Sequence, residues 1–154
     1  WQVLAGFNWT DNPSDVLVHL ADYHLDDHEY YFREFWSGES GSWDGKNPLC
    51  FEAVPPHGCV LLALKPKTEF PHYLGSDLHF TQGIELVDWQ VGEDALRFTL
   101  RLPRSTKGSV ILALPRGASE VRVNNQLVEL SHIKKDLYSL PLVVDGFCLV
   151  EIQV

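Results

Sequence analysis

The sequence predicts an all-β fold, an antiparallel β-sandwich made of two packed strand-rich modules. The main observation is a hydrophobic period of two, seen best in residues 95–102, where Leu96, Phe98, Leu100 and Leu102 alternate with other side chains. Short segments rich in turn-forming residues separate such stretches. Nine prolines and eleven glycines, spread along 154 residues, leave little room for a long helix.

In the first half of the chain, strands are expected at residues 1–9, 16–20, 29–36, 49–54 and 59–64. Residues 16–20 are apolar and β-branched, and residues 29–36 are rich in aromatic side chains, both of which favour strands. The turn 55–58, with the sequence Pro-Pro-His-Gly, separates the last two segments and predicts a β-hairpin. Residues 38–47 are rich in Gly and Ser and indicate an exposed loop.

In the second half, strands are expected at residues 84–91, 95–102, 110–114, 120–123, 126–130 and 148–154. Within residues 84–91 the apolar parity changes after Leu86, which predicts a β-bulge. Asn124-Asn125 separates two of the strands and predicts a second hairpin, and Asp145-Gly146 marks a turn before the last strand.

The stretch from Lys65 to Thr81 is rich in Pro, His and small polar residues and divides two strand-dense halves. We therefore expect a first β module at residues 1–76 and a second β module, packed on the first, at residues 77–154. The two halves could instead be the two sheets of one sandwich.

Charge and hydropathy narrow the classes of partner. Twelve Lys and Arg residues against 21 Asp and Glu give a net charge of −9, and the basic residues are scattered, which argues against nucleic acid and anionic membranes as partners. No apolar run approaches the roughly 20 residues of a membrane-spanning helix. The sequence does not indicate a cellular compartment.

The chain begins at Trp1, within a predicted strand, and contains no methionine, so we expect it to be a piece of a longer protein. Its three cysteines, Cys50, Cys59 and Cys148, are an odd number without close pairing, which argues against a disulfide framework. We expect all three to be buried as small hydrophobic residues.

No catalytic residue, metal site or cofactor is predicted. Residues 22–29 hold several Asp and His side chains that could bind a metal, but their spacing matches no recognised ligand motif, and a solvated acidic loop is the better interpretation. Several carboxylates could form a glycosidase pair, but nothing in the sequence pairs any two of them. The motifs of serine hydrolases, phosphate-binding loops and zinc peptidases do not occur.

Exposed tryptophans can stack on the apolar faces of sugars. Trp43 is the candidate carbohydrate-binding residue, because it lies in the segment expected to be an exposed loop. Trp9, Trp36 and Trp89 continue strand patterns, so we expect them in the core. Asn8-Trp9-Thr10 matches the N-glycosylation acceptor pattern, a match that is too short to carry weight.

Several segments occur in an order that resembles a known domain. The run Val3-Leu4-Ala5-Gly6-Phe7-Asn8-Trp9-Thr10-Asp11 resembles the opening strand of the carboxy-terminal β-sandwich domain of α-galactosidase-like glycoside hydrolases, the family 36 and melibiase group. Val16–Leu20, Phe35-Trp36-Ser37-Gly38 and Val54-Pro55-Pro56-His57-Gly58-Cys59 are similar to later pieces of that domain. The match covers about the first 65 residues, and the rest looks like an added β module.

In that family the catalytic carboxylates lie in a barrel that this chain lacks, so the resemblance implies a non-catalytic accessory role and transfers no active-site residue. The implied partner is the catalytic domain of the same polypeptide, and we expect an apolar patch that this partner covers. The alternatives are a stand-alone carbohydrate-binding module, which would use exposed aromatic residues, and a small independent hydrolase.

Overall fold

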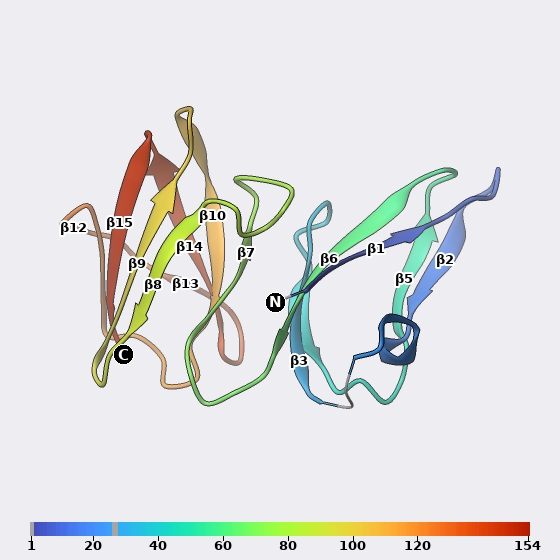
Figure 1. The fold of residues 1–154 in the computed structure, drawn as a ribbon, viewed down its shortest axis with the longest axis horizontal. Helices are drawn as coiled ribbons and strands as arrows, with labels where there is room; N and C mark the ends of the chain where they lie inside the picture. Colours follow the sequence, from blue (N-terminus) through green and yellow to red (C-terminus); the bar gives the residue numbers. More distant parts are fainter. Residues whose placement is uncertain (1, 26–27) are drawn as a thin grey trace. The chain divides into compact units, whose positions relative to one another are not determined.

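The computed structural model describes residues 2–25 and 28–154, and it confirms the all-β prediction. The chain divides into two compact units, Trp1–Lys67 and Thr68–Val154 (Figure 1). The sequence placed the boundary after residue 76, whereas the structure places β7 (His72–Ser76) in the second unit. The physical reason is that β7 forms an antiparallel ladder with β10 (Thr106–Ala113) of that unit.

The first unit contains six strands and one short 3-10 helix among its described residues. The strands form one four-stranded antiparallel sheet in the order β1-β6-β3-β4 and one two-stranded sheet, β2-β5. The elements are β1 (Gln2–Phe7), β2 (Ser14–Val18), η1 (Leu20–Tyr23), β3 (Tyr30–Glu34), β4 (Ser40–Trp43), β5 (Leu49–Val54) and β6 (Cys59–Pro66).

The core of the first unit lies between its two sheets. Strand alternation turns one face of each sheet inward, and the buried residues of both sheets form one cluster with Leu20 of η1: Val16, Val18, Leu20, Tyr30, Phe32, Trp43, Val54, Val60, Leu62 and Leu64. The sheets approach closely at Gly6, where an added Cβ would lie 2.6 Å from Cγ1 of Val16. A side chain at residue 6 would therefore push β1 away from β2.

The second unit is a larger sandwich of two antiparallel sheets. Their strand orders are β13-β14-β10-β7 and β12-β11-β15-β9-β8. The further elements are β8 (Leu86–Val91), β9 (Ala95–Arg101), β11 (Glu120–Val123), β12 (Gln126–Leu127), β13 (Ser131–Lys134), β14 (Leu137–Val144) and β15 (Phe147–Gln153).

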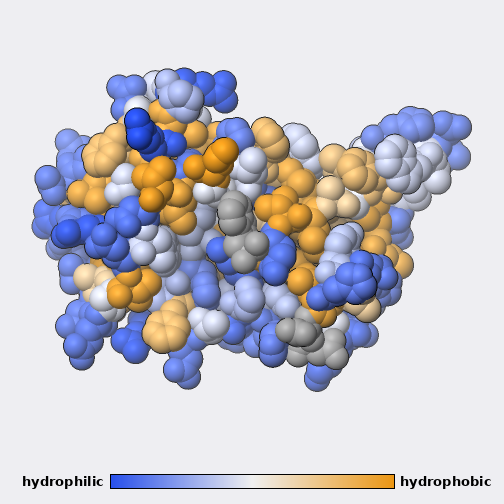
Figure 2. Space-filling view, viewed as in Figure 1, coloured by the Kyte–Doolittle hydropathy of each residue, from blue (hydrophilic) through white to orange (hydrophobic). Residues whose placement is uncertain are grey.

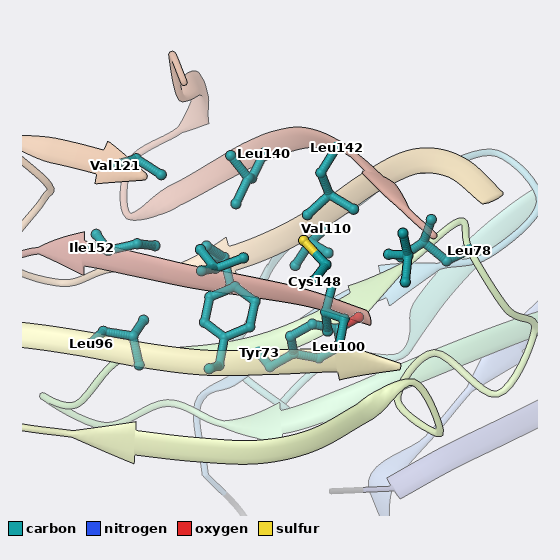
Figure 3. Close-up of a cluster of buried hydrophobic side chains, with 14 of the residues drawn as sticks. Tyr73, Leu78, Leu96, Leu100, Val110, Val121, Leu140, Leu142, Cys148 and Ile152 are labelled. Carbon is teal, nitrogen blue, oxygen red and sulfur yellow. The ribbon is translucent and has the colours of Figure 1, made fainter. Parts of the chain in front are cut away.

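Side chains from both sheets of the second unit meet in its core (Figure 3). Leu96, Val121 and Ile152 come from one sheet, and Leu140 and Leu142 come from the other. The inward residues of β9 are the ones that the sequence pattern assigned to a single face. Burial of this apolar surface, at about 25 cal/mol per Å², is the main stabilising contribution to the unit.

Two local predictions in the second unit are confirmed. Asn124 and Asn125 both have positive φ angles, of 49° and 67°, and connect β11 to β12, which pair at Val123 and Gln126. Positive φ at both central residues is the requirement of a type I′ hairpin turn. The predicted bulge also occurs, because the register of β8 on β9 shifts between Leu86 and Asp88.

The predicted hairpin at residues 49–64 is wrong. β5 and β6 follow each other along the chain, but β5 pairs with β2, while β6 pairs with β1 and β3. The turn therefore carries the chain from one sheet to the other. Ala53, where the register of β5 on β2 shifts, and His57, in the turn, have positive φ angles of 50° and 55°.

A buried polar cluster crosses the interior of the second unit. The carboxylate of Glu85 is fully buried, and its Oε1 accepts hydrogen bonds from the Tyr73 hydroxyl, at 2.5 Å, and from the Ser76 hydroxyl. The backbone carbonyl of Glu85 accepts a bond from the Arg101 amide at 2.8 Å. This residue therefore connects β7 to β9, which belong to opposite sheets.

We predict that Glu85→Ala lowers the free energy of unfolding of the second unit by about 3 kcal/mol, since it leaves two buried hydroxyls without their acceptor and opens a cavity. Amide hydrogen exchange of β9 and β10 measures this loss. The same Glu85→Ala change should cost less unfolding free energy in a Tyr73→Phe, Ser76→Ala variant, because that variant lacks the two hydroxyl donors that would lose their acceptor. An equal loss in both backgrounds would contradict the assigned role of these bonds.

Candidate functional site

One end of the first unit is organised around the side chain of Asn8, which lies just after β1 and is 3% exposed. Its Nδ2 donates to the carbonyl oxygens of Val54 and Pro55, at 2.9 and 3.1 Å, and to that of Asn12 at 2.8 Å. Its backbone amide donates to the carbonyl of Gly58 at 2.9 Å. A single buried amide thus joins residues 7–12 to the turn between β5 and β6.

Further contacts complete this junction. Oδ1 of Asn8 accepts from the amide and the hydroxyl of Thr10, at 2.9 and 2.8 Å. Nε2 of His57 lies 3.1 Å from Oδ1 of Asp11 across the two segments. His57, in this turn, has a φ angle of 55°, and such strain persists where surrounding contacts hold the backbone in place. We call residues 7–12 and 54–58 the corner.

The corner presents a pair of exposed aromatic rings. Phe7 and Trp9 stack with their ring centroids 5.1 Å apart and an interplanar angle of 23°. Trp9 is 77% exposed and Phe7 is 48% exposed. Strand alternation places Val3, also exposed, on the same face of β1 as Phe7. The expectation that Trp9 lies in the core is wrong, because β1 ends at Phe7 and Trp9 follows the strand.

Trp43, the residue predicted to bind carbohydrate, lies in the core. It is 5% exposed, and its Nε1 donates to the carbonyl of Asn47 at 2.6 Å. The segment expected to be an exposed loop contains β4, whose pairing with β3 turns Trp43 inward beside Tyr30. The expected exposure of Trp43 is therefore wrong, and its ring offers no free face for a sugar.

Trp36 is the exposed tryptophan of the turn between β3 and β4. It is 63% exposed, contrary to the expectation of a core position. The turn is held by Glu34, whose Oε2 accepts from the amide and hydroxyl of Ser37, at 2.6 and 2.8 Å. Oε1 of Glu34 accepts from the amide of Leu61 at 3.1 Å. The Glu34 carboxylate is thus committed to fixing the turn that carries Trp36.

An open hollow of about 460 Å³ lies in the first unit beside this turn, between it and β5. Trp36, Glu39 and Glu52 line it together with Glu34, Ser37, Cys50, Phe51, Ala53, Val54, Pro55, Cys59 and Val60. Desolvation, reinforced by the negative charges of Asp15 and Glu52, raises the pKa of the Cys50 thiol. The wall of the hollow at β5 is therefore electronegative.

The cysteines differ in burial. All three are free thiols: Cys148 is buried, Cys59 is partly buried and Cys50 is exposed. The expected burial of Cys50 is wrong, because alternation along β5 turns Leu49 and Phe51 toward the core and Cys50 outward. Burial raises the pKa of the Cys148 thiol.

Trp89 behaves as predicted. It packs against the core of the second unit, with its ring tilted on Phe98 at 5.2 Å and edge-on to Tyr73 at 6.3 Å.

The Asn8-Trp9-Thr10 match to the N-glycosylation pattern has a structural explanation. The side-chain amide of Asn8 is buried and donates hydrogen bonds to three backbone carbonyls.

The acidic segment at residues 22–29, interpreted from the sequence as a solvated loop, is only partly described. Asp26 and Asp27 lie outside the described residues. Among residues 2–25 and 28–154, no group of three or more His, Cys, Asp and Glu side chains is arranged to hold a metal ion. The same residues contain no helix long and apolar enough to cross a membrane.

A signal for the exposed aromatic residues exists in the sequence. Trp9 precedes Thr10-Asp11-Asn12-Pro13, and Trp36 precedes Ser37-Gly38, both of which are turn sequences. An aromatic residue at the edge of a turn is less constrained to the core than one in mid-strand.

No family model matches the chain, and a search of curated proteins finds no match.

We predict that Asn8→Ala lowers the free energy of unfolding of the first unit by about 3 kcal/mol, because it removes the buried donor and acceptor that join the corner. Asn8→Asp should destabilise at least as strongly, since it turns a carboxylate oxygen toward carbonyl oxygens. Thr10→Ser retains the hydroxyl and should have little effect. Urea unfolding followed by tryptophan fluorescence measures each change, and a stable Asn8→Asp variant would contradict the assigned donors.

We predict that Glu52→Gln speeds alkylation of Cys50 by iodoacetamide near pH 8. Removing the negative charge lowers the thiol pKa, so more of the reactive thiolate is present. Peptide mass spectrometry measures the rate at each cysteine. Glu129→Gln, in the second unit, is the control and should leave the rate unchanged. Cys148 should react only after unfolding, and an unaltered Cys50 rate in Glu52→Gln would contradict the electronegative wall.

Proposed function

We propose that this chain is a non-catalytic accessory domain, carboxy-terminal in a glycoside hydrolase, that docks on the catalytic domain of the same polypeptide through the corner of its first unit. The observation that carries the proposal is the stacked, exposed pair Phe7 and Trp9 on a corner braced by Asn8. The corner, residues 7–12 and 54–58, includes parts of two of the segments on which the resemblance to that family rests.

The physical chemistry of the corner supports a docking role. Tryptophan is enriched among the residues that contribute most to protein interfaces. Ordering a flexible loop weakens association, and here the hydrogen bonds of Asn8 and Thr10 have already ordered the segment that carries Trp9. Figure 2 shows apolar residues among hydrophilic ones on the displayed face of the first unit. At the corner itself, Phe7 and Trp9 are exposed beside Val3, and exposed apolar groups are a recognised feature of interaction surfaces.

The buried carboxylates support a non-catalytic role. Glu34 and Glu85 are the buried acidic residues of the described chain, and each accepts hydrogen bonds that hold the fold together. A glycosidase requires two carboxyl groups that face the scissile bond from opposite sides. Glu34 and Glu85 belong to different units, and both are engaged in structural bonds. The isolated chain should therefore not hydrolyse chromogenic glycosides.

We predict that Phe7→Ala, Trp9→Ala in the complete gene product removes about 2 kcal/mol or more of stabilising contact with the catalytic domain. The midpoint of thermal inactivation should fall by several degrees, whereas the same change in the isolated chain should shift its unfolding midpoint little, because both rings are exposed there. Leu127→Ala, an exposed position in the second unit, is the matched control. Equal shifts in the complete protein and the isolated chain would contradict docking at the corner.

A further inference from the structure

We infer that the hollow beside Trp36 is a binding subsite for a neutral saccharide, with the indole of Trp36 as its platform and Glu39 and Glu52 as hydroxyl acceptors. This inference does not rest on the docking role of the corner. It locates carbohydrate recognition at a residue that the sequence assigned to the core, in place of the buried Trp43.

The platform is exposed and held in place. Trp36 is 63% exposed, and its ring packs edge-on against Phe35, with centroids 4.9 Å apart and an interplanar angle of 82°. The three bonds accepted by the Glu34 carboxylate fix the turn on both sides of the ring. Gly38, with φ of 73°, lets the chain return to β4. A ligand that binds this ring therefore loses little affinity to the conformational entropy of ordering the turn.

The residues that line the hollow determine which class of ligand it can bind. Glu39 and Glu52 are exposed carboxylates at the edge of the hollow, and none of the described lining residues is Lys, Arg or His. Anionic ligands are therefore disfavoured. Carboxylates accept hydrogen bonds from hydroxyl groups, and an indole face packs on apolar C–H surface. A sugar ring carries both kinds of surface, with hydroxyls around its edge and C–H groups on its face.

The size of the hollow suits a sugar ring, whereas its negative charge would also attract an organic cation, so the titration below includes one. About 460 Å³ falls within the range of small-molecule sites. The innermost carboxylate, Glu34, already accepts three internal hydrogen bonds, so its oxygens are largely committed to the fold and the exposed Glu39 and Glu52 are the acceptors open to a ligand. The remaining carboxylates lie in solvent at the edge, where an isolated cation over one ring gains only about 0.5–1 kcal/mol.

The test uses NMR titration of the whole chain with cellotriose, maltotriose and galactotriose. Each of the five tryptophans contributes one indole N–H signal, and Trp36→Ala identifies the signal of Trp36. At least one trisaccharide should shift this signal saturably. Trp36→Ala should then weaken binding, measured by calorimetry, by about tenfold or more, which is about 1.4 kcal/mol. Glu52→Gln should weaken it several-fold, because a neutral amide is a poorer acceptor.

Trp9→Ala is the matched control, since it removes another exposed indole that does not line the hollow. It should leave the affinity unchanged, which also separates this inference from the docking role of the corner. Three results would overturn the inference: no saturable shift with any of the three sugars, equal loss of affinity in Trp9→Ala and Trp36→Ala, or preferential binding of tetramethylammonium chloride that weakens with added salt. Thermal unfolding of each variant checks that both substitutions leave the fold intact.

Discussion

The buried amide of Asn8 is the constraint on which the arrangement of the first unit depends. Its donors and acceptor join the end of β1 to the turn that carries the chain from β5 to β6. A buried amide without partners is costly, so the two segments are tied to one relative position. Because β5 and β6 belong to different sheets, this junction also fixes how the small sandwich closes at that end.

The exposed aromatic residues follow from this closure. Phe7 ends a strand whose opposite face packs on the core, so its ring points outward, and the bonded turn after it holds Trp9 against it. At the turn between β3 and β4, the Glu34 carboxylate holds the backbone that carries Trp36, as Asn8 holds the backbone that carries Trp9. In both places a buried polar side chain stabilises a turn that presents an indole to solvent. Rings held in this way are suited to bind, because little conformational freedom remains to be lost.

Much of the fold follows from the sequence, since alternation is a local signal. The strands around Leu96–Leu100 and the hairpin at Asn124-Asn125 were predictable from residues close together in the chain. The candidate site was not. Proline and glycine mark a turn at residues 55–58, but that this turn crosses between sheets depends on tertiary contacts, among them the partners of Asn8. The Gly and Ser around Trp43 indicated a loop, whereas pairing with β3 and burial of the indole outweighed that composition.

The central claim, that the corner docks on a catalytic domain of the same polypeptide, is tested most directly by hydroxyl-radical footprinting of Trp9. Oxidation of its indole should be rapid in the isolated chain, where the ring is 77% exposed, and should be suppressed in the complete protein. The exposed ring of Trp36 provides an internal reference within the same unit. Equally rapid oxidation of Trp9 in the isolated chain and in the complete protein would contradict the account.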